Sequence, residues 1–189
     1  GRLVTNKIWS AHAEECSLHL IEPEELDFFR RSQIYGFPDD APRFLYFCKA
    51  AIEYLASLGK PIDVLHLHDW HTAACAPLMR DLYAAKLQVG KIVLTIHNLE
   101  YQGKCAAPDL DSIGLEGKAY LTPRRMQDPN PLYPKTINLL KGGILYSDAV
   151  NTVSPSYAEE ILLPEMGFGL TETLKRKKVR GILNGIDQT

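Results

Sequence analysis

The chain contains an apolar run that ends abruptly in a polar loop, and this feature constrains its fold more than any other. Residues 91–96 read Lys-Ile-Val-Leu-Thr-Ile, which is typical of a buried strand, and residues 97–103 read His-Asn-Leu-Glu-Tyr-Gln-Gly. Residues 63–67 repeat the arrangement, because this strand-like run is followed at once by His-Asp-Trp-His at 68–71. Ligands bind at the carboxyl ends of strands in parallel α/β sheets. The two polar segments therefore predict one shared polar cleft.

Strand-like and helical patterns alternate along most of the chain. The apolar spacing predicts strands at residues 3–9, 17–22, 63–67, 91–96, 149–153 and 179–183. Spacing, caps and stop signals predict helices at 23–29, between a cap at 39–40 and a stop at 59–61, at 71–85, at 135–146, from 155 onward and at 169–178. This order predicts an α/β fold with a doubly wound, mostly parallel sheet of the Rossmann-like type.

Residues 104–134 interrupt the alternation. They are rich in Pro, Gly and Asp, and we expect an irregular excursion with one or two short helices. Excursions of this length within a compact domain are usually functional loops or lids. Residues 141–143 read Lys-Gly-Gly inside a helical pattern with no strand before them. We interpret them as a place of close helix packing and not as a phosphate-binding loop.

The bulk composition argues against several classes of protein. A net charge of −2 over 189 residues is unlike a dedicated nucleic-acid binder, which would be basic. No apolar run approaches the length of a transmembrane helix, so no membrane partner is expected. The 4 cysteines lack metal-site spacing and favour free, buried thiols in a reducing compartment. Because the chain lacks an initiator methionine and ends just after its last expected strand, we expect a processed form or a fragment.

His66, His68, Asp69 and His71 crowd the end of one strand. Imidazole and carboxylate groups are common metal ligands, but this spacing matches no hydrolase zinc motif and no further ligand is predictable. We therefore expect no metal. A metal-dependent hydrolase remains the alternative, and finding stoichiometric zinc in the purified protein would support it. For His66 we favour a histidine in the core or one that supports a neighbouring group.

Asp69 and the pair His97-Asn98 each have two interpretations. Asp69 either positions a sugar hydroxyl or assists proton movement, or it caps the helix that follows. His97 and Asn98 form either a binding site or a turn closed by glycine. Tyr101 and Gln102 offer the flat apolar face and the amide that sugar recognition uses. Spacing alone does not decide between these interpretations.

Two further positions are weaker signals. Tyr35 precedes a glycine in a loop, where the plain interpretation is an exposed aromatic in a turn. Asn184 belongs to an Asn-Gly turn dipeptide, and it gains interest because it follows the last expected strand.

Five segments together resemble one enzyme family. They are HDWHTA at 68–73, TIHNLEYQG at 95–103, KGGILYSD at 141–148, TVSPSYAEE at 152–160 and GILNGID at 181–187. In this order they resemble the ADP-glucose-dependent starch and bacterial glycogen synthases, which are retaining glycosyltransferases of the GT-B type. The resemblance covers residue 35 to the end of the chain. The segment RMQD at 125–128 is most similar to a plant or algal soluble starch synthase.

The resemblance implies that residues 1–189 are part of the N-terminal, acceptor-side domain of a GT-B fold, with the C-terminal nucleotide-sugar domain absent. It implies transfer of glucose from ADP-glucose to the non-reducing end of an α-1,4-glucan, without a cofactor. It implies a plastid location, in the chloroplast or amyloplast stroma, for a plant or algal protein and a cytoplasmic one otherwise. His97 would lie beside the donor glucose and Asp69 near the reaction centre. The residues that would contact sugar are Tyr35, Asn98, Tyr101, Gln102 and Asn184.

The chain departs from the family pattern at its start. The family carries a Lys-x-Gly-Gly-Leu loop there that contacts the nucleotide-sugar, and no segment near the N-terminus matches it. We therefore expect the parent protein to be a starch synthase and these residues alone to be inactive. The alternative from another class is a non-catalytic module that binds glucan or serves in assembly. The sequence leaves the oligomeric state open.

Overall fold

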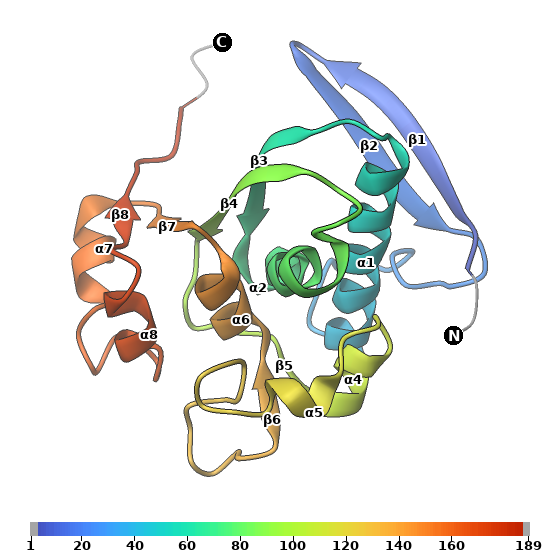
Figure 1. Cartoon of the computed structure of the whole chain (residues 1–189). Coiled ribbons are helices and arrows are strands. Elements are labelled where there is room, and N and C mark those ends of the chain that lie inside the picture. Colours follow the sequence, from blue (N-terminus) through green and yellow to red (C-terminus); the bar gives the residue numbers. More distant parts are fainter. Residues whose placement is uncertain (1–3, 187–189) are drawn as a thin grey trace.

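The computed structural model describes residues 4–186, so the start of the strand predicted at 3–9 lies outside it. Within that range the central sheet has the strand order β3-β4-β7-β8, with every pair parallel (Figure 1). The strands are β3 (Ile62–His68), β4 (Val89–Ile96), β7 (Ala149–Thr152) and β8 (Arg180–Gly181). The predicted parallel sheet is confirmed.

Helices connect these strands and cover one face of the sheet. Between β3 and β4 run α2 (Asp69–Ala73), α3 (Cys75–Pro77) and a π-helical stretch, η1 (Leu78–Tyr83). Helix α6 (Leu139–Tyr146) precedes β7, and α7 (Pro155–Glu160) and α8 (Thr171–Lys175) precede β8. Because strand order follows chain order and such crossovers are right-handed, the connections share one face.

The opposite face of the sheet stays open within residues 4–186. Val64 on β3 is 51% exposed, and its alternate neighbours His66 and His68 are exposed as well. A doubly wound sheet would carry helices on this face too, and the described residues supply only one of the two layers. At its carboxyl edge this open face is polar, because it carries His66 and His68.

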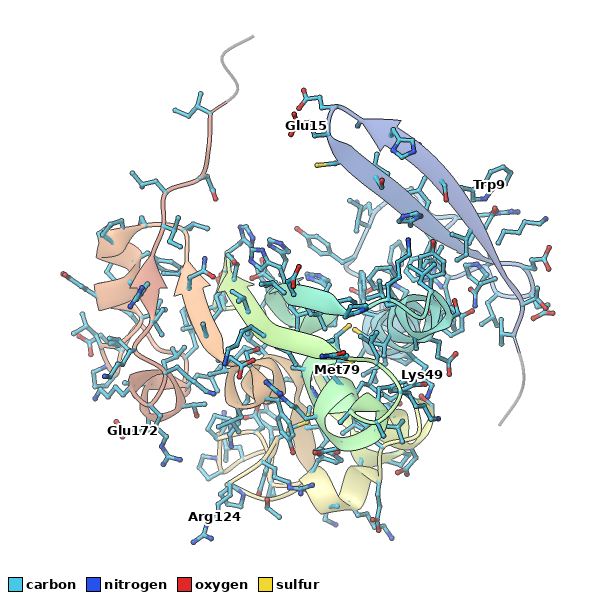
Figure 2. The ribbon with its side chains drawn as sticks, turned by 45° about the horizontal axis from the view of Figure 1, so that its top comes forward. Trp9, Glu15, Lys49, Met79, Arg124 and Glu172 are labelled. Atoms are coloured by element: carbon cyan, nitrogen blue, oxygen red, sulfur yellow. The ribbon has the colours of Figure 1, made fainter. Side chains whose placement is uncertain are left out.

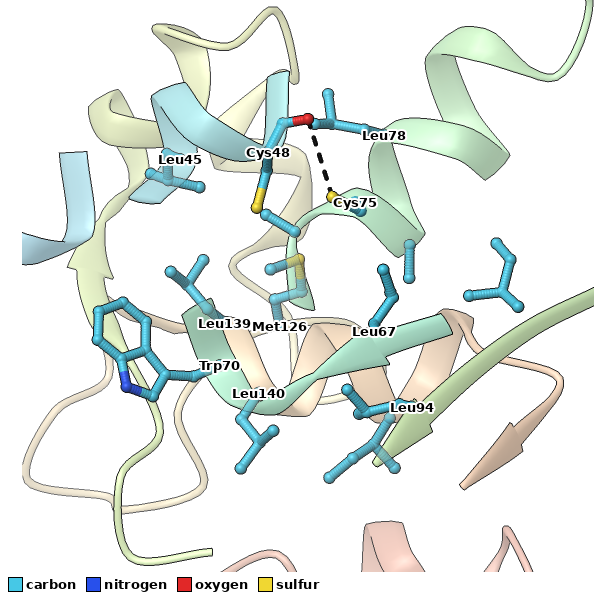
Figure 3. Packing of buried hydrophobic residues seen from close by; sticks show 14 of the residues in the cluster. Leu45, Cys48, Leu67, Trp70, Cys75, Leu78, Leu94, Met126, Leu139 and Leu140 are labelled. Atoms are coloured by element: carbon cyan, nitrogen blue, oxygen red, sulfur yellow. Dashed lines mark hydrogen bonds between the residues drawn. The ribbon is translucent and has the colours of Figure 1, made fainter. Parts of the chain in front are cut away.

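The core lies between the sheet and the helices α1 (Asp40–Ser57), α2 and α6. Leu67 and Leu94 of the sheet are buried together with Leu139 and Leu140 of α6 (Figure 3). Close packing of α6 is confirmed, because a Cβ at Gly143 would lie 2.7 Å from the Cβ of Ala73. Glycine thus lets two helices approach more closely than any larger residue would.

An antiparallel hairpin lies beside α1, at the edge of this body (Figures 1 and 2). Its strands, β1 (Asn6–Ala13) and β2 (Cys16–Pro23), are longer than predicted, and the turn shrinks to Glu14 and Glu15. Most hairpin residues are exposed, including Trp9, whose indole N–H donates to the Glu22 carboxylate at 2.8 Å.

The helix predicted at residues 23–29 is wrong. Pro23 is the last residue of β2, and bends follow it. The buried guanidinium of Arg43 donates to the carbonyl of Phe28 at 3.1 Å and to that of Ile34. Because a tertiary partner takes the Phe28 carbonyl and the Phe29 ring packs on Phe44, the local helix signal is overridden.

The excursion at residues 104–134 is irregular with two short helices, as predicted. It holds β5 (Lys104–Ala106), α4 (Ala107–Asp111) and α5 (Gly117–Tyr120). The sequence analysis missed the antiparallel pairing of β5 with β6 (Thr136–Asn138). As a result α6 begins at Leu139 and not at 135, with the Asn138 side chain accepting from the Lys141 N–H at 2.9 Å.

The predicted free thiols are confirmed, since all four cysteines are unpaired and Cys48, Cys75 and Cys105 are buried. Burial raises the pKa of the Cys105 thiol to about 12, which suppresses its reactivity. The Cys75 thiol donates to the Cys48 carbonyl at 3.8 Å within the core (Figure 3). Across the part of the chain that the structure describes, no helix has the length and apolar character needed to cross a bilayer.

Candidate functional site

The two polar segments that follow β3 and β4 lie side by side. The strands are parallel neighbours, and His68 at the end of β3 is in register with Thr95 of β4. The segment 68–71 therefore meets the loop 97–103 at the carboxyl edge of the sheet, as the alternation of strands and helices predicted.

The carboxylate of Asp69 holds the neighbouring loop in place. Its Oδ1 atom accepts hydrogen bonds from the backbone N–H of His97 at 2.7 Å and of Asn98 at 3.3 Å. The backbone of Asp69 has a φ of +52°, which is in the left-handed region. His68 occupies the N-cap position of α2, and no side chain caps that helix. The N-cap interpretation of Asp69 is therefore wrong, since its carboxylate serves the loop after β4.

Three imidazoles line the open face beside this carboxylate. The Nδ1 atom of His68 lies 3.0 Å from Nε2 of His97, which is hydrogen-bonding distance. The His66 and His68 ring centroids are 4.3 Å apart. His66 is exposed and not in the core, but its Nε2 bonds the Thr95 hydroxyl at 2.6 Å. The core location offered for His66 is therefore wrong, and the neighbouring group that its ring contacts is the Thr95 hydroxyl.

The charge state of His68 follows from these neighbours. Packing that removes water from its ring lowers the pKa of His68, and the nearby His66 and His97 lower it further. The Asp69 carboxylate acts in the opposite sense. The net direction favours a neutral imidazole at His68 near pH 7.

The hydrolase alternative gains no support from this geometry. In residues 4–186 no three His, Cys, Asp or Glu side chains come together as a metal site would need. Instead, the His68 and His97 rings pair with each other, and the His66 ring bonds the Thr95 hydroxyl.

The loop 97–103 is shaped by its own turn and by α7. The Asn98 side chain accepts from the backbone N–H of Glu100 at 3.0 Å, which closes an Asx turn. The Leu99 N–H donates to the Tyr157 hydroxyl at 3.0 Å. Tyr101 is 55% exposed, so its ring is available to a ligand.

Gly103 ends the loop against the indole of Trp70. Its φ is +60°, and a Cβ there would lie 2.2 Å from Cε3 of Trp70. Both the backbone conformation and the close approach require glycine at this position.

Gln102 is used differently from the prediction. It is only 6% exposed, and its Nε2 atom donates to the carbonyls of Leu99 at 3.3 Å and Phe168 at 3.1 Å. Its Oε1 atom accepts from the Asn138 amide at 2.6 Å. Both ends of the Gln102 amide are thus committed inside the protein. The predicted sugar contact does not fit this arrangement, and Gln102 instead ties the loop 97–103 to β6 and to the segment before α8.

Tyr35 comes close to the site, and Asn184 shares its edge of the sheet. The Tyr35 ring is 53% exposed and its centroid lies 5.4 Å from that of His71, which belongs to the 68–71 segment. Asn184 follows the end of β8 and is exposed. Because β7 separates β4 from β8, Asn184 lies beyond one further strand, and the described residues show no hydrogen bond from it to the other predicted site residues.

Sequence reasoning missed two residues that hold the site together, Thr72 and Tyr157. The Thr72 hydroxyl accepts from the His68 N–H at 2.6 Å and donates to the His68 carbonyl at 2.9 Å. A threonine one turn into a helix commonly hydrogen-bonds the backbone at the start of that helix, so Thr72 could have been predicted. The bond from Leu99 to Tyr157 joins distant segments, and no local pattern indicates it.

Comparison with known proteins places the chain in a family. A model described as "Starch synthase catalytic domain" matches residues 2–176, which is most of the chain. The chain belongs to the starch synthase catalytic domain family. The resemblance inferred from the five sequence segments is therefore confirmed.

Two relatives and one structure illustrate this membership. A glycogen synthase of Protochlamydia amoebophila is 51% identical over 192 residues, covering 99% of this chain and 38% of that protein. A probable starch synthase 4, chloroplastic/amyloplastic, of Arabidopsis thaliana is 48% identical over 191 residues, covering 99% of this chain and 18% of that protein. The catalytic domain of Arabidopsis thaliana starch synthase IV, bound to ADP and acarbose, superposes with a TM-score of 0.91 at 47% identity.

The match to this starch synthase structure covers 99% of the chain and 38% of the solved domain. The mixed α/β fold with its parallel sheet is therefore that of one portion of a GT-B glycosyltransferase catalytic domain. The chain spans less than two-fifths of the length of the relatives named here. Neither the metal-dependent hydrolase nor the non-catalytic module finds support among them.

Proposed function

We propose that these residues form the acceptor-side part of an enzyme that transfers glucose from ADP-glucose to the non-reducing 4-hydroxyl of an α-1,4-glucan, with retention of configuration. The observation that supports this most is the Asp69 carboxylate holding the His97 loop at the carboxyl edge of the sheet, at 2.7 Å. That edge is the general ligand-binding position of such folds. The solved relative is bound to ADP and acarbose, and these two ligands agree with the proposed substrate class.

Each predicted residue has a role in this proposal. His97 lies beside the donor glucose, and Asp69 acts near the reaction centre by fixing the backbone from which His97 projects. Tyr101 and Tyr35 offer exposed rings for stacking on sugar. Asn98 and Asn184 are exposed amides that can exchange hydrogen bonds with hydroxyls. Gln102 takes no direct part and holds the loop from behind.

The proposal extends to domain organisation and location. Residues 1–189 correspond to part of an N-terminal domain, and the groups that bind the nucleotide-sugar lie in the remainder of the enzyme. This division is consistent with the 38% of the solved catalytic domain that the chain covers. For a plant or algal protein we propose the plastid as its compartment, and for a bacterial one the cytoplasm.

The test is glucan extension by the complete enzyme that contains these residues. With ADP-glucose and a maltooligosaccharide, we expect release of ADP and lengthening of the glucan. His97→Ala should lower kcat/KM by a factor of about 100 or more, because a group that contacts the reacting sugar is lost. His12→Ala is the matched control, since His12 lies on the exposed hairpin and should leave the rate unchanged.

The folded state of each variant is checked by thermal unfolding, so that a loss of activity is not mistaken for a loss of structure. Full activity in His97→Ala would remove His97 from the site. Absence of ADP release in the folded wild-type enzyme would overturn the proposed reaction itself.

A further inference from the structure

We propose that His68 is a positioning residue for His97: its Nδ1 atom pairs with Nε2 of His97, fixes the orientation and tautomer of that ring, and leaves Nδ1 of His97 as the ring atom that meets the sugar. This inference rests on the proposed function, since it assumes that His97 faces the substrate. The pairing of the two rings can be tested without measuring enzyme activity.

Both partners of the pair are held at their backbones. His68 is the last residue of β3, and the Thr72 hydroxyl bonds both its N–H at 2.6 Å and its carbonyl at 2.9 Å. His97 follows the end of β4, and the Asp69 carboxylate bonds its N–H at 2.7 Å. Two rings anchored in this way on neighbouring strands meet in one arrangement, with 3.0 Å between Nδ1 and Nε2.

The Thr95 hydroxyl determines which nitrogen of a neutral His66 carries the ring proton. The Thr95 hydroxyl donates its single proton to the Asn151 side chain at 3.0 Å. The His66 Nε2, at 2.6 Å from the same oxygen, must therefore be the donor in that contact. This places the ring proton of a neutral His66 on Nε2. His66 is thus bonded to Thr95, and through Thr95 to Asn151, and not to His97.

The His68–His97 pair can hold only one proton between its facing nitrogens. When Nδ1 of His68 donates, Nε2 of His97 accepts, and the proton of a neutral His97 then lies on Nδ1. Protons on both facing nitrogens would repel each other. The crowding of His66 and His97 around His68 opposes a positive charge there, whereas the Asp69 carboxylate favours one. Whichever ring donates, Nε2 of His97 is taken by His68, and Nδ1 of His97 is the ring atom left to exchange a hydrogen bond with a sugar hydroxyl.

The experiment compares three variants of the complete enzyme. His68→Leu removes the ring nitrogen, and His68→Asn places an amide close to the position of Nδ1. His12→Gln is the matched control, because His12 lies on the exposed hairpin and not at the strand ends that carry the site. The tautomer of His97 is read from the ¹⁵N shifts of histidine-labelled protein, and kcat/KM is measured alongside.

We expect one ring tautomer at His97 in the wild type and a mixture in His68→Leu, as for a free imidazole. We also expect kcat/KM to fall at least about tenfold in His68→Leu and to recover to within about threefold in His68→Asn. His12→Gln should change neither readout. Unchanged ¹⁵N shifts at His97 in a folded His68→Leu protein would overturn the pairing.

The two proposals fail separately. Altered His97 shifts with an unchanged kcat/KM would keep the pairing but overturn the positioning role, whereas the placement of His97 at the substrate fails only if His97→Ala keeps full activity. A fall in kcat/KM that His68→Asn does not rescue, with normal His97 shifts, would assign His68 another role and overturn this inference.

Discussion

The Asp69 carboxylate accepts a hydrogen bond at 2.7 Å from the backbone N–H of His97, which joins two segments 28 residues apart in the sequence. The same oxygen reaches the N–H of Asn98 at 3.3 Å. A side chain that follows β3 thus fixes the backbone of the loop that follows β4. Since these N–H groups have no strand partner beyond the end of β4, the carboxylate supplies the acceptor they need.

Replacement of Asp69 should separate its hydrogen-bonding role from its charge. Asp69→Ala loses the acceptor and places a residue with a Cβ but no polar group at a φ of +52°, so we expect a loss of about 2–3 kcal/mol in the free energy of unfolding. Asp69→Asn keeps an acceptor oxygen and tolerates the left-handed conformation, so about 1 kcal/mol or less is expected. Urea unfolding of both variants measures the difference, and equal losses would contradict this role.

The close approach of Gly103 to Trp70 gives a second test with a built-in control. Gly103→Ala combines a left-handed backbone with a Cβ 2.2 Å from the indole, whereas Gly59 has a φ of +63° with no atom within 4 Å. We expect about 1 kcal/mol of destabilisation in Gly59→Ala and about 3 kcal/mol or more in Gly103→Ala. Thermal unfolding reports both. Similar losses would mean that the indole moves aside at no cost.

Gln102 should matter for stability more than its polarity suggests. Gln102→Leu leaves the Leu99 and Phe168 carbonyls without their amide donor and deprives Asn138 of an acceptor, so a loss of about 3 kcal/mol is expected. Gln127→Leu is the control, since that side chain makes a single bond to the Pro134 carbonyl and should cost less than about 1 kcal/mol. Chemical denaturation compares the two, and a silent Gln102→Leu would rule out the bracing role.

The stability of the folded protein should depend on pH through His71. Burial lowers the pKa of His71 below its ordinary value of 6.5, and its Nε2 atom has no hydrogen-bond partner among residues 4–186. The unfolded chain therefore binds a proton at a higher pH than the folded one, so stability falls as the pH drops below 6.5. A single such group changes the unfolding free energy by at most about 1.4 kcal/mol per pH unit.

In His71→Phe this contribution should vanish, and the fall in melting temperature between pH 7 and pH 5 should become shallower. Some slope remains, because the pKa of His68 is lowered as well. A slope in His71→Phe as steep as in the wild type would show that His71 gains its proton without cost in the folded state.

The parallel sheet and the edge on which the site lies follow from local patterns in the sequence. Apolar runs of strand length predicted β3, β4 and β7, because period and composition are local properties of the chain. The position of Asp69 and His97 directly after two such runs then placed both at one edge, as the register His68↔Thr95 bears out.

The contacts that individual polar side chains make there depend on the folding of distant segments onto one another. Asp69 serves a loop 28 residues away, and Gln102 reaches Phe168 across 66 residues. The bends after Pro23 arise in the same way, from the Arg43 guanidinium reaching the Phe28 carbonyl. Hydrogen-bond partners so distant in the chain leave no trace in local spacing, because each residue type fits a cap, a turn or a ligand contact equally well until folding brings one partner within reach.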